Sequence, residues 1–129
     1  MQTKPTLTSH DAKTIAARCL EAARRHDVCV SIAVVDEAGK LLHFERMDDA
    51  RGYTGDLAIR KAQTSAAVGV PTSVIEALAK ERPMQDFIAL RGGMPVFHDG
   101  KCAGAVGISG AKPEIDEAVA TAGTLTMGV

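Results

Sequence analysis

The segment 28–35 constrains the fold most, because it reads as a strand that is apolar on both faces. Val28, Val30, Ile32 and Val34 point to one side, and Cys29, Ser31, Ala33 and Val35 point to the other. A strand without a solvated side has to be covered on both faces. The segment therefore predicts a central strand that lies between two layers of helices.

The segment 92–111 combines a glycine pair, a hairpin turn and a strand interrupted by glycines. Asp99-Gly100 is a strong signal for a two-residue hairpin turn, since both residue types accept a positive φ. Gly104 and Gly107 weaken the strand that follows unless another backbone or a ligand comes close. These glycines indicate either a ligand site or tight packing of a helix on the sheet.

Helical periodicity predicts four helices, over residues 9–26, 56–69, 72–80 and 113–122. Thr8 and Asp11 have the spacing of a capping box at the start of the first helix. Thr72 or Ser73 is expected to cap the third helix, and Gly123 to end the last one.

Strands are predicted at 28–35 and 41–46, at 88–90, and on both sides of Asp99-Gly100. Hairpins connect most of them, so the sheet is expected to be mainly antiparallel. Residues 1–129 then form a single domain of the α+β class, a three-layer α/β/α sandwich. The alanine-rich helix faces exceed what one small sheet can cover, which favours a homo-oligomer.

Composition excludes several classes of function. The net charge is -1 without a basic block, and only 3% of residues are aromatic, so nucleic acid is a poor candidate partner. No apolar run approaches the roughly 18 residues that a membrane span needs. The amino terminus lacks a signal-peptide pattern, and three scattered cysteines are typical of reduced thiols, so we expect a cytoplasmic protein. No zinc-ligand spacing, phosphate loop or nucleophile elbow occurs, and no metal site is predicted.

Three blocks in order resemble a known family: VSIAVVDEAGKLL at 30–42 with FERMDDA at 44–50, RKAQTSA at 60–66, and GGMPV at 92–96 with GAVGISGA at 104–111. They resemble the haem-binding GlcG/HbpS family, which also supplies the carboxy-terminal domain of PduO-type cobalamin adenosyltransferases. The resemblance covers nearly the whole chain. It implies a profilin-like sandwich with a five-stranded antiparallel sheet, homo-oligomers that include octamers, and association with a catabolic pathway.

Haem is the cofactor that this resemblance implies, bound in a cleft beside Gly92, Gly93, Met94 and Pro95. Haem iron needs a His, Cys, Met or Tyr donor and an apolar slot for the macrocycle. The donors near the family blocks are His43, His98, Met84, Met94 and Cys102. The sequence alone does not choose among them.

A lyase or isomerase that acts on a small organic acid is the alternative hypothesis. Arg46, Arg60 and Lys61 are cations that suit a carboxylate, and the N–H groups of Gly92-Gly93 suit an anion nest. Glu45, Asp48 or His98 then serves as general base. Ordinary surface ion pairs, Arg46 with Asp48 or Asp49 and Arg60 with Asp56, explain the same residues. An inert oligomeric accessory protein is the third hypothesis.

Overall fold

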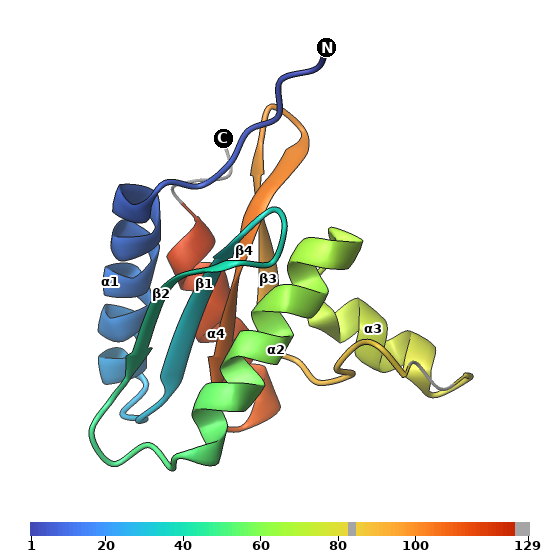
Figure 1. Cartoon of the computed structure of the whole chain (residues 1–129). Coiled ribbons are helices and arrows are strands. Elements are labelled where there is room, and N and C mark those ends of the chain that lie inside the picture. Colours follow the sequence, from blue (N-terminus) through green and yellow to red (C-terminus); the bar gives the residue numbers. More distant parts are fainter. Residues whose placement is uncertain (83–84, 126–129) are drawn as a thin grey trace.

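A four-stranded antiparallel sheet forms the middle of three layers in the computed structural model, which describes residues 1–82 and 85–125 (Figure 1). The elements follow the order α1 (Ser9–Arg25), β1 (Ser31–Asp36), β2 (Leu41–Arg46), α2 (Tyr53–Val68), α3 (Thr72–Ala79), β3 (Gly93–His98), β4 (Lys101–Ser109) and α4 (Pro113–Thr124). Helices α1 and α4 pack together on one face of the sheet, α2 covers the other, and α3 projects to the side. The predicted α/β/α sandwich is confirmed.

The strands lie in the order β2-β1-β4-β3, so β1 is a central strand as its two apolar faces predict. The β3–β4 hairpin turns at Asp99 and Gly100, with φ values of 50° and 76°. The predicted fifth strand is wrong: residues 88–90 form no strand, and the sheet has four. The N–H of Ile88 donates to Oγ1 of Thr64 on α2 at 3.0 Å, so its donor serves a helix side chain rather than a strand partner.

A bulge in the β1–β2 ladder changes which side chains of β2 share a face. Ala33 pairs with Phe44 and Val34 with His43, but Val35 pairs with Leu41, which leaves Leu42 as the extra residue. Leu42 therefore packs on the core shared with α1 and α4, whereas Phe44 faces α2 at Gly55. Leu42 and Phe44 thus point to opposite faces although they are two residues apart, because a bulge shifts the alternation by one residue.

The helix ends confirm one predicted cap and correct two. Thr8 and Asp11 form the reciprocal capping box at the start of α1. The hydroxyl of Thr72 does not cap α3; Pro71 holds the cap position, and Thr72 Oγ1 accepts the N–H of Gly93 at 2.8 Å. Gly123 lies inside α4 rather than after it, and its bare Cα allows α4 to pack against Cys19 Sγ of α1, where a Cβ would clash.

Strand glycines of β4 allow neighbouring segments to pack closely against the sheet. A Cβ at Gly107 would meet the α2 backbone at Ala58 and Ala62, and one at Gly104 would meet Leu7 and Val35. Tight packing thus accounts for both glycines. No helix in residues 1–82 and 85–125 is long and apolar enough to cross a membrane.

Candidate functional site

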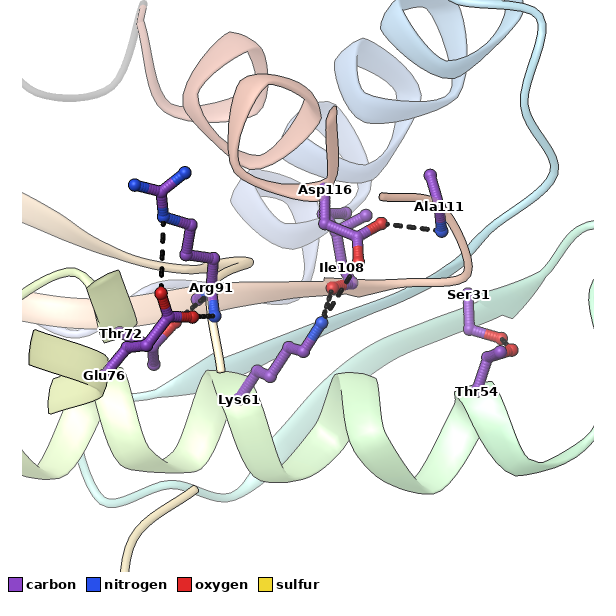
Figure 2. A network of polar contacts seen from close by, with 10 residues as sticks. Ser31, Thr54, Lys61, Thr72, Glu76, Arg91, Ile108, Ala111 and Asp116 are labelled. Carbon is purple, nitrogen blue, oxygen red and sulfur yellow. Dashed lines mark hydrogen bonds and ion pairs between the residues drawn. The ribbon is translucent and has the colours of Figure 1, made fainter. Parts of the chain in front are cut away.

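Lys61 and Asp116 form a buried ion pair where α2, β4 and α4 meet (Figure 2). Lys61 Nζ lies 3.2 Å from Asp116 Oδ2 and donates to the carbonyl oxygen of Ile108 at 2.8 Å. Asp116 Oδ1 accepts the N–H of Ala111 at 3.0 Å. Each side chain is only 4% exposed, so the pair is closed to solvent.

Burial shifts both groups of this pair in the direction that favours their neutral forms. It lowers the pKa of Lys61 while the Asp116 carboxylate opposes the shift, and it raises the pKa of Asp116 while Lys61 opposes it. The charges remain together because each has a close partner and a further hydrogen bond. In this arrangement, Lys61 holds three elements together.

The glycine pair at the start of β3 is packed against this lysine. A Cβ at Gly92 would lie 2.9 Å from Lys61 Nζ, and one at Gly93 would lie 2.6 Å from the Thr72 methyl group. The N–H of Gly93, one of the two donors expected in an anion nest, is already bound to Thr72. The structure therefore brings Lys61 and the glycine pair together, as the cleft hypothesis requires, but in direct contact, with no space left between them for a ligand.

The remaining residues of the organic-acid hypothesis lie apart from this junction. Arg46 is exposed at the end of β2 and lies beside Gly52, while Asp48 is exposed in the loop that follows. His43 and Glu45 lie on the opposite face of β2, with His43 Nε2 3.7 Å from Glu45 Oε1. Among the described residues, neither Arg46 nor Arg60 forms the surface ion pairs that the sequence suggested.

A hollow of about 440 Å³ beside the β3–β4 hairpin contains His98 and is called the His98 groove below. Its lining residues come from the amino-terminal segment, from the first turn of α1 and from both strands: Pro5, Thr6, Leu7, Asp11, Val96, Phe97, His98 and Ala103. The N–H of Leu7 donates to the carbonyl oxygen of Ala103 at 3.0 Å, which fixes the amino-terminal segment against β4. A second hollow of about 330 Å³ shares Pro5 and His98 and adds Lys4 and Lys101.

Of the haem donors suggested by sequence, His98 is the one that lines these hollows. The Met94 side chain packs against the core of the α1–α4 side, and Pro95 beside it occupies the edge strand β3, where a missing N–H is tolerated. Cys102 Sγ donates to the carbonyl oxygen of Gly104 at 3.3 Å. Met84 lies outside the described residues. In residues 1–82 and 85–125, no three His, Cys, Asp or Glu side chains gather as metal ligands.

A separate hollow of about 430 Å³ lies beside the carboxy-terminal half of α2 and is called the α2 cavity below. The β1–β2 turn, α2 and the segment before β3 line it: Glu37, Ala38, Gly39, Lys40, Arg60, Gln63, Thr64, Ala67, Asp86, Phe87 and Ile88. Arg60 is the predicted site residue that it contains.

Sequence reasoning missed the partners that complete each hollow. Leu7 and Lys4 join His98 only because the amino-terminal segment runs beside β4, a contact that no local pattern encodes.

Asp116, the partner of Lys61, carried a usable signal in the sequence. It lies three and four residues before the buried Val119 and Ala120 and therefore on the inner face of α4.

The sequence and the fold both match known proteins. Residues 7–124 match a family described as haem degrading protein HbpS-like. Protein GlcG of Escherichia coli K12 is 36% identical over 114 residues, which are 84% of this chain and 85% of that protein. A double-mutant HbpS of Streptomyces reticuli superposes with a TM-score of 0.92 at 32% identity, covering 100% of this chain and 92% of that one. A PduOC:heme complex superposes with a TM-score of 0.82 at 25% identity, covering 92% of this chain and 93% of that one.

Proposed function

Since this chain belongs to the HbpS-like family, we propose that it binds haem and that the His98 groove is the site. The observation that supports this location is a histidine at the rim of a hollow that also contains apolar side chains, Phe97 among them. Haem binding needs an iron donor and an apolar surface for the macrocycle, and this groove supplies both. When bound, haem would supply redox-active iron.

Phe97 supplies the exposed apolar surface of the groove. It is 37% exposed at the margin, where its ring is available to a flat ligand. Leu7, Val96 and Ala103 close the bottom of the groove and are themselves only 6%, 2% and 3% exposed. A planar macrocycle that covers Phe97 removes apolar surface from water.

Polar groups at the rim suit the remaining parts of haem. The His98 imidazole is 62% exposed and has Asp99 Oδ2 within 3.4 Å of its Nε2. The Asp99 carboxylate thus places a negative charge beside this imidazole. Lys4 and Lys101, in the adjoining hollow, are placed to attract the propionate groups.

Haemin titration tests the proposal. We expect wild-type protein to shift the Soret band saturably with one haem per chain, and His98→Ala to weaken binding at least about tenfold by loss of the iron donor. His26→Ala, which removes an exposed histidine at the end of α1, is the matched control and should bind as wild type does. His43→Ala tests the other strand histidine and should also leave binding unchanged. Loss of the shift in His43→Ala with full binding in His98→Ala would refute this site.

A further inference from the structure

We propose that the α2 cavity is a second binding site, for a small carboxylic acid that carries a hydroxyl or ammonium group next to its carboxylate. The α2 cavity and the His98 groove share no lining residue. The proposal is therefore independent of haem binding. Its volume, about 430 Å³, lies in the range of small-molecule sites, which is roughly 300–1,000 Å³.

Both walls of the cavity are fastened to α2. Gln63 Nε2 donates to the carbonyl oxygen of Gly39 at 3.2 Å, which holds the β1–β2 turn against the helix. Thr64 Oγ1 accepts the N–H of Ile88 at 3.0 Å, which holds the opposite segment. Asp36 Oδ1 also accepts the N–H groups of Ala38 and Lys40, each at 2.9 Å, and so fixes the turn internally. These hydrogen bonds fix the backbone of both walls before any ligand binds.

Four charged side chains line the cavity, two of each sign. Arg60 and Lys40 are the cations, and Glu37 and Asp86 are the anions. Within residues 1–82 and 85–125, none of the four forms an ion pair with another charged group. Both signs of charge are thus available to a ligand that carries complementary groups.

This charge pattern selects the chemical class of the ligand. A guanidinium binds a carboxylate through two parallel hydrogen bonds, and Lys40 adds a second positive charge. A carboxylate side chain only accepts hydrogen bonds, so Glu37 and Asp86 call for a donor, which a hydroxyl or ammonium group provides. Ala67 and Phe87 leave an apolar wall for a short carbon chain. Lactate and alanine carry this chemistry, while propionate has the same carbon skeleton without the donor.

Amide NMR titration of the whole chain with lactate, alanine and propionate tests the proposal. We expect lactate, alanine or both to shift amides of residues 37–40, 60–67 and 86–88 saturably. Propionate should bind at least about tenfold more weakly, because Glu37 and Asp86 lose water without gaining a donor. Saturation by lactate alone identifies a hydroxy acid, and saturation by alanine alone identifies an amino acid.

Variants separate recognition of the two ends of the ligand. Arg60→Gln should weaken binding of the acid at least about tenfold, and Glu37→Gln should reduce the discrimination against propionate. Arg18→Gln, an exposed change on α1, is the matched control and should bind as wild type does. Well-dispersed spectra of each variant establish that it is folded. Shifts that are unaffected by Arg60→Gln, equal binding of propionate, or no saturable shift at this cavity with either acid would overturn the proposal.

Discussion

At the scale of single residues, Lys61 and Asp116 bury opposite charges where three elements meet, and this burial has a cost. Desolvation acts against both charged forms, and the hydrogen bonds to Ile108 and Ala111 offset part of it. Removing one partner leaves the other as an unpaired buried charge. The stability of the fold should therefore depend more on the pair being complete than on the pair being charged.

Double-mutant analysis of this pair checks that dependence. Lys61→Met should lower the free energy of unfolding by about 3–5 kcal/mol, because Asp116 remains buried without its cation. Adding Asp116→Asn should recover part of the loss, since the amide oxygen still accepts the Ala111 N–H without carrying charge. Urea unfolding of both single variants and the double variant measures this. A double variant that loses the sum of the two single losses would contradict the account.

The cysteines differ in burial, and this predicts their reactivity. Burial raises the pKa of the Cys19 thiol to about 12, so this side chain holds almost no reactive thiolate near neutral pH. Cys29 is exposed, and Cys102 is partly buried. In the native protein, a thiol reagent such as DTNB should modify Cys29 first and Cys19 only after unfolding. Cys29→Ser should remove the fast phase; a fast phase that persists in this variant and disappears in Cys19→Ser would be inconsistent with the packing.

At the scale of elements, the capping box of α1 links a helix end to pH. The backbone N–H of Thr8 is the main cause that holds the pKa of Asp11 below its ordinary value of 3.8. Because the folded pKa is the lower one, Asp11 stabilises the folded state above 3.8, and this contribution disappears as the pH falls through the folded pKa.

Two substitutions test the cap. Thr8→Ala should cost about 1 kcal/mol, the usual value for a lost helix cap. Asp11→Asn should destabilise the protein at neutral pH, and its deficit relative to wild type should shrink as the pH falls below 3.8. Denaturant unfolding across this pH range provides both values. A deficit that stays constant at all pH values would show that the charge of Asp11 has no part in the cap.

Elements whose signals are local could be predicted from the sequence. The two-sided apolar strand, the Asp99-Gly100 turn and the Thr8 cap each depend on neighbours in the chain, and each is confirmed. Residues 88–90 are apolar as a strand would be, but a side chain of α2 takes the N–H of Ile88. The bulge at Leu42 likewise depends on the partner strand rather than on β2 itself. In both segments, contacts with residues far away in the sequence determine the local structure.

At the scale of the whole molecule, the candidate sites are assembled from segments far apart in the sequence. The sequence names His98 as a candidate donor, but the groove around it joins residues 5–7 with β3 and β4. The sequence names Arg60 as a candidate anchor, but the cavity beside it needs the β1–β2 turn and residues 86–88. The sequence also suggested Lys61 as an anchor for a ligand carboxylate. In the fold, Lys61 binds the Asp116 carboxylate instead, and its residue type gives no sign of that partner. The sequence therefore indicates which residue types are candidates for a site, whereas the residues that surround them can be identified only from the fold.

The homo-oligomer expected from the alanine-rich helices stays a prediction. Val74 and Leu78, four residues apart on α3, are 42% and 46% exposed. Residues at this spacing lie on the same side of a helix, so they provide an apolar surface that a second copy is able to cover.

Mapping a bound porphyrin by amide NMR tests most directly whether this chain holds haem in the His98 groove. Gallium protoporphyrin is a diamagnetic substitute for haem that leaves the spectrum observable. We expect it to perturb residues 5–7, 96–98 and 101–103, and His98→Ala to remove these changes. Perturbations that concentrate instead on β2 around His43, with residues 5–7 unaffected, would contradict it.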